Sequence, residues 1–592
     1  MRRAAVGVSA LRGKLLIPPR SGSTITSAIY HHNAWFHSKS RDSSEALGTP
    51  AKLPDAELIP SRPSHQRVTI NDILERRAKA GKLDAGTAAA SDSDMFKGPQ
   101  AGKLKSQRWD HHLSEEARVR EPCVLKQAAK HLKKPGLISL GGGLPCAEYF
   151  PFESLSMKVP RSPHFSEEAT RTSGDTLHIG KYDVSQTEDA VYDLSIALNY
   201  GQATGSAQVI RFVTEHTELV CNPPYADWRC ILTVGSTGAL EQAFRMLFDS
   251  NRGDSLLTEE YSFSTALETA IPLGINVFGV KMDEQGLLPE SMDEMLANWD
   301  SSHKEGGARK PHVLYTVPSG QNPTGATQGE QRRRDIYKVA QKYDVYIIED
   351  EPYYFLQMEP YSNNGAVAIS SPSPTPTPPP QTVDSFLSTL IPTLLSMDTD
   401  GRVMRMDSLS KVVVPGSRLG WITASAQMVE RYQRHAEVCN QGPSGFSQVI
   451  LHKLLDEHWG HDGYLRWLMN LRLEYTARRD VMLAACEKYL PQEIVSWTPP
   501  VAGMFHWLKV NHALHPDASS KDILTIEEEI FNSCIEKGVL VGRGSWFRAE
   551  RDSNTPPADM FFRATFAAAT PTNMTEAIRR FGEAVKESYR IQ

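Results

Sequence analysis

Lys411 stands in a short segment whose other polar residues suit a phosphate group. Ser408 and Ser410 precede it, and Arg418 follows it. A lysine amine forms a Schiff base with an aldehyde, and burial or nearby positive charge lowers its pKa enough to supply the free amine. Serine hydroxyls and a forked guanidinium group are good phosphate donors. The segment therefore predicts a lysine that reacts with a carbonyl compound held by its phosphate.

A second candidate phosphate site is the stretch "GSTGA", residues 235–239, between a predicted strand and a predicted helix. Backbone N–H groups at a helix N-terminus bind phosphate, and the hydroxyl groups of Ser236 and Thr237 add donors. An ordinary strand-to-helix turn is the alternative, and the motif alone does not decide between the two.

Further polar and aromatic residues follow the predicted strands. Asp350 ends the apolar stretch 345–350, where an unpaired carboxylate is costly, so it needs a cationic partner. A protonated pyridine nitrogen or an arginine would serve. Asn322 and Tyr353 are candidates to hydrogen-bond a phenolic oxygen, with turn chemistry and packing as their alternatives. Tyr261 either stacks on a flat ring or fills the core.

A Schiff-base lysine, a carboxylate for a pyridinium and a phosphate cup together describe a site for pyridoxal phosphate. The elements that must position them are strands alternating with helices, which predicts a mainly parallel sheet covered on both faces. In such sheets the ligand lies beyond the carboxyl ends of the strands. The strands are predicted at 230–234, 312–317, 345–350, 402–407 and 419–424.

One predicted helix matters for the later argument. Thr327 and Glu330 have the spacing of a capping box, and the residues after them form one apolar helix face. We interpret the three arginines 332–334 as a solvated face of this helix. The adjacent histidines 111–112 and 31–32 form no motif with cysteine or carboxylate partners, and we interpret them as surface residues rather than metal ligands.

Composition limits the classes of protein. The chain has 592 residues, 40% of them hydrophobic, which predicts two or more globular domains. The net charge of -6 gives no reason to expect a nucleic acid or an anionic membrane as partner. No apolar run is long enough to span a bilayer. Seven cysteines without a CxxC pair favour a reducing compartment and indicate no zinc site.

The N-terminus differs from the rest. Residues 1–41 contain arginine and lysine but no acidic residue, which is typical of a mitochondrial targeting segment. A basic disordered tail on a cytoplasmic protein is the alternative. Residues 42–105 are predicted to be a disordered linker, with a short helix at 70–83. The Pro/Ser-rich insertion 360–400 is predicted to loop out at the surface.

A set of longer motifs carries a family resemblance. The chain resembles the fold-type I pyridoxal-phosphate aminotransferases of class I/II, over roughly 110–592. Within them it is most similar to the fungal aromatic-amino-acid and 2-aminoadipate aminotransferases, a subgroup that includes kynurenine aminotransferases. The motifs are "ISLGGGLPCAEYFPF" (138–152), "YGQATGSAQVIRFV" (200–213), "LTVGSTGALEQAFRML" (232–247), "YTVPSGQNPTG" (315–325), "IIEDEPYYFLQ" (347–357), "DSLSKVVVPGSRLGW" (407–421) and "FFRATFA" (561–567).

The resemblance implies an α/β fold. A large cofactor-binding domain has a mainly parallel seven-stranded sheet with helices on both faces, and a smaller α/β domain is built from the N-terminal segment and the C-terminal part. The expected divisions are 1–41 for targeting, 42–105 as linker, 106–205 as N-terminal arm and part of the small domain, 206–430 as large domain, and 431–592 as connecting helix and C-terminal small domain.

The resemblance also implies catalytic roles. Lys411 forms the Schiff base and moves the proton between substrate and cofactor. Asp350 pairs with the pyridine nitrogen. Tyr353 and Asn322 hold the ring oxygen, and Tyr261 stacks on the ring face.

Other residues bind the phosphate and the substrate by the same resemblance. Tyr200 would reach the phosphate of the neighbouring subunit, so the expected unit is a homodimer with shared active sites. Arg563 and Asn322 bind the substrate, Arg563 through the α-carboxylate, which the backbone at Gly143 also approaches. The phosphate contacts are Ser236, Thr237, Ser408, Ser410 and Arg418.

The implied activity is transamination of aromatic amino acids with a 2-oxo acid such as 2-oxoglutarate, in amino-acid biosynthesis or degradation. 2-Aminoadipate and kynurenine are further candidate donors. A β-lyase on the same fold is an alternative, because it would use the same lysine and aspartate. A non-enzymatic, aminotransferase-like transcription regulator is less favoured, since residues 1–105 are too polar for a winged helix.

Overall fold

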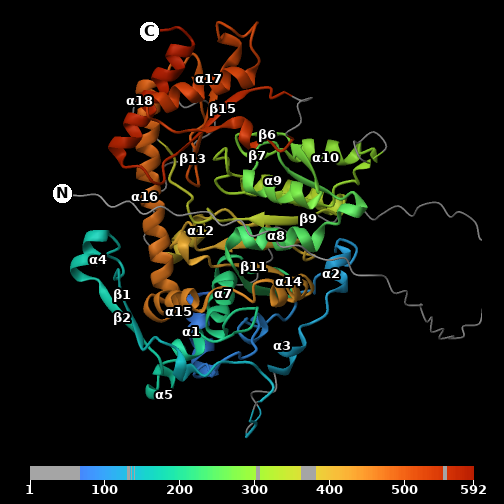
Figure 1. The fold of residues 1–592 in the computed structure, drawn as a ribbon, viewed down its shortest axis with the longest axis vertical. Helices are drawn as coiled ribbons and strands as arrows, with labels where there is room; N and C mark the ends of the chain where they lie inside the picture. The colour runs from blue at the N-terminus through green and yellow to red at the C-terminus, as the bar shows by residue number, and fades with distance from the viewer. Residues whose placement is uncertain are drawn as a thin grey trace, which may run out of the picture. The chain divides into compact units, whose positions relative to one another are not determined.

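A seven-stranded sheet is the central element of the structure (Figure 1). The computed structural model describes residues 67–592, apart from 130–133, 135, 139, 302–306, 362–381 and 551–555. The strand order is β3-β11-β10-β9-β8-β4-β5, and only β11 runs antiparallel to its neighbours. This confirms the predicted mainly parallel sheet. The strands are β3 (Trp228–Thr233), β4 (Ser255–Glu259), β5 (Asn276–Val280), β8 (Val313–Thr316), β9 (Tyr346–Asp350), β10 (Val403–Ser408) and β11 (Gly420–Ser425).

Five of these seven strands, β4, β8, β9, β10 and β11, are buried along their whole length. Strands covered on both faces are continuous apolar runs rather than alternating ones. The helices that connect and cover them are α7 (Ala207–Val220), α8 (Gly235–Leu247), α9 (Ser264–Ala270), α10 (Pro289–Ala297), α11 (Glu330–Lys342) and α14 (Ala426–Cys439).

Helix α11 does not begin with the predicted capping box. Its N-cap is Gly329, which has no side-chain cap, so the helix starts after the position that a box at Thr327 requires. The Thr327 Oγ1 atom accepts instead from the Gly320 backbone N–H, at 3.0 Å. The Thr327 hydroxyl therefore holds the preceding loop closed and does not cap the helix, so the capping prediction is wrong.

A second sheet lies in the C-terminal part. Its order is β12-β13-β15-β14, all antiparallel. Figure 1 shows β15, α17 and α18 together, with the long helix α16 packed against α18 and extending toward the large sheet. The elements are β12 (Val495–Ser496), β13 (Phe505–Val510), β14 (Gly542–Arg543), β15 (Met560–Thr565), α16 (Gly460–Tyr489), α17 (Ile523–Glu536) and α18 (Pro571–Ser588).

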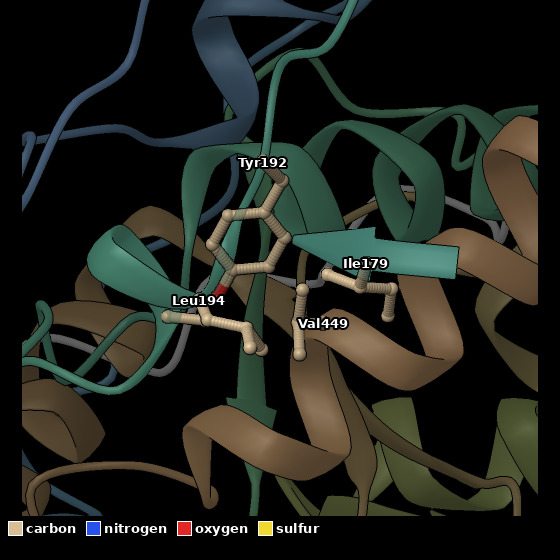
Figure 2. Close-up of a cluster of buried hydrophobic side chains, with 5 residues drawn as sticks. Ile179, Tyr192, Leu194 and Val449 are labelled. Carbon is tan, nitrogen blue, oxygen red and sulfur yellow. The ribbon is translucent and has the colours of Figure 1, made fainter. Parts of the chain in front are cut away.

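The segment before α7 forms an antiparallel hairpin with its own small core (Figure 2). Tyr192, Leu194 and Ile179 pack there against Val449 of α15 (Gly445–His452). The hairpin is thereby joined to the start of the C-terminal part. Its elements and their neighbours are α2 (Glu115–Val119), α3 (Val124–Ala129), β1 (Ser154–Val159), α4 (Glu167–Ser173), β2 (Asp175–Gly180), α5 (Asp183–Gln186) and α6 (Leu194–Ala197). A further short hairpin joins β6 (Met282–Asp283) to β7 (Gly286–Leu287).

Residues 67–105 differ from the predicted disordered linker. They include α1 (Ile70–Ala80), which starts with a capping box from Thr69, and Ile73 is fully buried. The Arg77 guanidinium donates to Glu215 of α7 and also pairs with Asp456. This segment was predicted to be disordered because it is polar, but its basic residues form ion pairs with buried acidic residues of the folded part. The predicted targeting segment 1–41 lies outside the described residues.

The described end of the Pro/Ser-rich insertion also departs from its prediction. Residues 382–400 contain α12 (Val383–Thr389) and α13 (Leu394–Met397), and Phe386 and Leu394 are fully buried. The backbone N–H of Leu394 donates to Glu349 at 2.7 Å. This portion is therefore part of the core rather than a surface loop, and 362–381 is not among the described residues.

None of the helices described in the structure combines the length and the apolar character needed to cross a lipid bilayer.

Candidate active site

A cavity of about 210 Å³ opens at the carboxyl ends of the parallel strands. Strands β9 and β10 deliver residues to it from the middle of the sheet, and α8 points its N-terminus toward it. This is where ligands bind in open parallel sheets, because the crossovers leave a crevice there. The predicted residues that line the cavity are Ser236, Thr237, Asn322, Asp350, Tyr353, Ser408, Ser410, Lys411 and Arg418.

One side of the cavity is a ready anion site. The Arg418 guanidinium donates to the Ser410 Oγ at 3.3 Å, and the Ser410 backbone N–H donates to the Ser408 Oγ at 3.1 Å. The buried Ser236 Oγ in the first turn of α8 has no hydrogen-bond partner among the described residues. A side chain at Gly235, whose φ is +69°, would collide with the Arg418 guanidinium. Hydroxyl donors, a guanidinium and a helix N-terminus together fit a phosphate group.

Asp350 lies at the opposite side of the site as a buried carboxyl group. It is only 5% exposed, and its Oδ2 accepts from the Tyr315 hydroxyl at 2.9 Å. Its Oδ1 has no partner among the described residues. Burial raises the pKa of Asp350 to about 6, and the Tyr315 hydrogen bond opposes that rise. A buried carboxylate with a free acceptor atom fits a protonated ring nitrogen.

Tyr315 is a site residue that the sequence reasoning missed. It belongs to the apolar strand β8, is fully buried and lines the cavity. A tyrosine within such a run is typical of the core. Only the pairing of β8 with β9 brings its hydroxyl to Asp350, and a linear pattern does not contain that pairing.

Lys411 follows β10 and faces the phosphate side. Partial burial lowers the pKa of its amine, and the positive charges of Arg418 and Arg563 lower it further. Each of these effects favours the uncharged, nucleophilic amine. The environment is therefore the one that the Schiff-base prediction requires.

Arg563 reaches the same site from β15 of the C-terminal sheet. Its Nη1 donates to the Asn322 Oδ1 at 2.8 Å. Its guanidinium lies 4.6 Å from the ring centroids of both Phe505 and Phe547, which hold it by cation–π contact. Burial raises the pKa of the nearby Tyr353, so its hydroxyl keeps its proton and can donate. The fixed guanidinium is suited to bidentate binding of a carboxylate.

Tyr261 does not lie where its predicted stacking role requires. Its ring packs against Trp507 and Phe561, with centroids 5.5 and 5.3 Å away, and it does not line the cavity. Phe263, which precedes α9, lines the cavity instead. The prediction chose the aromatic residue nearest the strand, but the loop turns Tyr261 toward the C-terminal sheet. The stacking prediction for Tyr261 is therefore wrong.

Tyr200 and Gly143 are not brought into the cavity of this chain. Tyr200 is 56% exposed, and Gly143 lies in an exposed stretch with no atom within 4 Å of the position of an added Cβ. Their predicted contacts, to the partner's phosphate and to the substrate carboxylate, stay predictions.

The histidine pair at 111–112 is only partly the surface feature that was predicted. His111 is exposed, but His112 is 2% exposed, and burial lowers its pKa to about 3. The Nε2 atoms of His111 and His112 lie 2.8 and 3.3 Å from the same carboxylate oxygen of Asp344. This partner was not predicted, because Asp344 is distant from the histidines along the chain. The pair at 31–32 lies outside the described residues.

Comparison with known proteins agrees with this geometry. The family model for aminotransferase class I and II matches residues 197–581. An aromatic amino acid aminotransferase of Schizosaccharomyces pombe is 44% identical, over 81% of this chain and 98% of that protein. An L-tyrosine:2-oxoglutarate aminotransferase of Serpula lacrymans is 32% identical, over 81% of this chain and 96% of that protein. The crystal structure of aminotransferase Aro8 from Candida albicans superposes with a TM-score of 0.73 at 38% identity, covering 83% of this chain and all of that one. On the evidence of the family model and these relatives, the chain belongs to the class I and II aminotransferases.

Proposed function

We propose that this aminotransferase transfers the amino group of aromatic amino acids to a 2-oxo acid such as 2-oxoglutarate. One observation carries the proposal: a single cavity joins the amine of Lys411, the buried carboxyl group of Asp350 and, through Asn322, the guanidinium of Arg563. The first two groups serve the cofactor and the third serves an amino acid that keeps its α-carboxylate.

The cofactor of this class is pyridoxal phosphate, and the residues fit it. The unpartnered Ser236 hydroxyl, Ser410 and Arg418 would hold the phosphate, and the free Oδ1 of Asp350 would accept from the ring nitrogen. When bound, pyridoxal phosphate supplies an electron sink that makes the substrate α-proton acidic. Phe263 has the place from which a side chain can cover the ring face.

The residues of the chain have separate roles toward the cofactor and the substrate. Asp350 would keep a proton on the ring nitrogen, because its buried Oδ1 has no hydrogen-bond partner among the described residues. Lys411 would hold the cofactor, and its free amine would take the proton from the substrate α-carbon. Tyr353 and Asn322 would donate to the ring oxygen. Arg563 orients the substrate so that its α-proton faces Lys411.

Two facts support aromatic donors. Phe505 lines the cavity beside Arg563 and offers flat apolar surface to an aromatic side chain. The relatives named above are an aromatic amino acid aminotransferase and an L-tyrosine:2-oxoglutarate aminotransferase. Kynurenine and 2-aminoadipate are further candidate donors, since a bovine relative at 30% identity is a kynurenine/alpha-aminoadipate aminotransferase.

The test is a donor screen on the purified protein loaded with pyridoxal phosphate. Phenylalanine, tyrosine, tryptophan, kynurenine and 2-aminoadipate are each supplied with 2-oxoglutarate, and glutamate and the new 2-oxo acid are quantified by mass spectrometry. We expect turnover with the aromatic donors and none without an acceptor. Ammonia release without an acceptor would instead identify a β-lyase, and turnover of 2-aminoadipate alone would refute the aromatic assignment.

We further propose a homodimer with shared active sites. Ile138, Leu140 and Tyr149 are 87%, 93% and 80% exposed, and Tyr200 is 56% exposed. A contiguous stretch of exposed apolar residues usually marks an interface, and a second copy of this chain would cover it. Light scattering should give about twice the chain mass, and Tyr200→Phe should weaken cofactor binding without dissociating the dimer. A monomer at micromolar concentration that retains full activity would refute this.

The basic, acid-free residues 1–41 support a mitochondrial location, with the cytoplasm as the alternative. Imaging of the full chain and of a variant lacking residues 1–41, each fused at its C-terminus to a fluorescent protein, separates the two. Only the full chain should colocalise with mitochondria.

A further inference from the structure

Arg333 is the exception among three consecutive arginines. The sequence predicts that residues 332–334 lie on a solvated helix face, yet Arg333 is 0% exposed. Its neighbours are partly buried and form ion pairs of their own, Arg332 with Asp283 and Arg334 with Glu330. The prediction is wrong for Arg333 because the first turn of α11 directs its side chain toward Ser319 and Glu351, which follow the ends of β8 and β9.

We propose that Arg333 is a positioning residue of the transamination site, which holds the loop of Asn322 and the strand end of Asp350 in fixed relation to each other. This inference rests on the proposed function of the cavity. Arg333 does not touch the cavity, so any effect on the reaction must pass through these two elements.

The guanidinium of Arg333 makes a hydrogen bond from each of its three nitrogens. Nε donates to the Gln328 carbonyl at 3.0 Å, Nη2 to the Ser319 Oγ at 2.8 Å, and Nη1 to the Glu351 Oε1 at 3.1 Å. The Ser319 hydroxyl also donates to the Glu351 Oε1, at 3.1 Å. The rigid guanidinium of Arg333 thus joins three places on the chain: Ser319, Gln328 and Glu351.

Two of these places are the ends of the loop that carries Asn322. The Gln328 N–H donates to the Pro318 carbonyl at 2.8 Å, which closes the base of the loop. Within it, Gln321 accepts from the Gly325 N–H at 2.6 Å and donates its side-chain amide to the Tyr261 carbonyl. Since the loop is internally tied, a shift at its base moves Asn322 as well.

The third place is directly behind Asp350. Glu351 follows it in the chain and is buried, and its N–H donates to the Met406 carbonyl of β10 at 3.0 Å. Successive side chains of an extended chain point to opposite faces, so Asp350 faces the cavity while Glu351 faces Arg333. A displaced Glu351 would therefore tilt the carboxylate that must meet the ring nitrogen.

The surrounding charges make Arg333 hard to replace. Arg405 pairs with Asp407, at 2.8 Å, and approaches Glu349 at 3.6 Å, so it is already shared between two acids. Arg333 lies 3.8 Å from Glu349 as well. Loss of Arg333 removes the hydrogen-bonded cation of the buried Glu351, which by itself destabilises the protein. The experiment must separate that effect from positioning.

Four variants and one control make the separation. Arg333→Met removes the fork, Arg333→Lys keeps the charge but not the fork, Glu351→Gln removes the acid, and Arg333→Met/Glu351→Gln removes both without an unpaired charge. Arg402→Met is the matched control. Arg402 is also buried on this sheet and pairs with Asp400, but it does not line the cavity. Each holoenzyme is assayed for kcat, KM, Tm and the pH dependence of its visible absorption.

We expect Arg333→Met and the double variant to lower kcat about 10- to 100-fold, the cost of misplacing reacting groups by about 1 Å. KM for the amino donor should change little, and the pH midpoint of the absorption should shift because Asp350 is displaced. Arg333→Lys should recover part of kcat. Arg402→Met should lower Tm with kcat and the pH midpoint unchanged.

The inference is overturned if the double variant keeps the wild-type kcat and pH midpoint and loses only Tm, as the control does. If Arg333→Met does not fold, the double variant and Arg333→Lys decide in the same way. Failure of the proposed function is a separate result, because the wild-type protein itself would then not transaminate.

Discussion

Asp350→Asn is the substitution whose outcome follows most directly from the structure. The amide has the shape of the carboxyl group and can still accept from Tyr315, so the change removes charge and little else. Burial raises the pKa of Asp350 from 3.8 to about 6. A rise of about two units corresponds to about 3 kcal/mol at pH 7.5, by which the charged form is disfavoured in the folded, cofactor-free protein.

The sign of the stability effect follows from this pKa. Because the folded pKa lies above the unfolded one, the folded state binds the proton more tightly, and stability falls as pH rises from 3.8 to about 6. Above about pH 6 the full free-energy cost of burying the charged Asp350 carboxylate is present. Asp350→Asn removes it, so the cofactor-free variant should be more stable than the wild type at pH 7.5, with Tm higher by a few degrees. At pH 4 the difference should vanish.

The effect on the reaction has the opposite sign. A ring nitrogen cation beside the ionised carboxylate would recover about the same 3 kcal/mol that its burial costs, and this coupling is lost in the variant. Since about 1.4 kcal/mol is tenfold in rate, kcat/KM should fall at least about 100-fold. Calorimetry with and without cofactor and steady-state kinetics measure both effects. A variant that is less stable without cofactor, or that keeps kcat/KM within tenfold, would refute the reasoning.

Three further predictions test the remaining contacts. Arg563→Lys loses the bidentate carboxylate fork and should raise KM for both the amino acid and the 2-oxo acid about tenfold or more, as steady-state kinetics will show. Phe263→Ala should weaken cofactor binding in a fluorescence titration while Tyr261→Ala lowers Tm only, because only Phe263 lines the cavity; the reverse pattern would restore Tyr261 as the stacking residue. Gly235→Ala introduces strain at φ +69° and a clash with Arg418, so cofactor affinity should fall about tenfold in an equilibrium titration, whereas Gly416→Ala, where no atom lies within 4 Å, should not alter it.

The central sheet was predictable because its strands are buried on both faces. That burial produces unbroken apolar runs such as the one ending at Asp350, and each run is followed by the polar residues that the site needs. Lys411 and Arg418 were found for the same reason. Their segment lies at a strand end, where chemistry is placed in such folds.

Residues whose role depends on pairing across the fold were missed. The sequence around Tyr315 is typical of the core, and that around Arg333 is typical of the surface. For the stacking residue the prediction named Tyr261, whereas Phe263, two residues later, lines the cavity. In each case the deciding fact is which element lies alongside, and local periodicity does not contain it. The short helix α1 was predicted, but its ion pairs with buried acids of the folded part were not, and α12 was missed because it packs through a few large side chains such as Phe386.

The most direct test concerns the amine of Lys411. The purified protein, saturated with pyridoxal phosphate, is reduced with borohydride, digested and mapped by mass spectrometry. The account predicts a stable pyridoxyl-phosphate adduct on Lys411, and loss of both the adduct and the activity in Lys411→Ala. An adduct at another lysine, or no adduct in a protein that still transaminates, would contradict it.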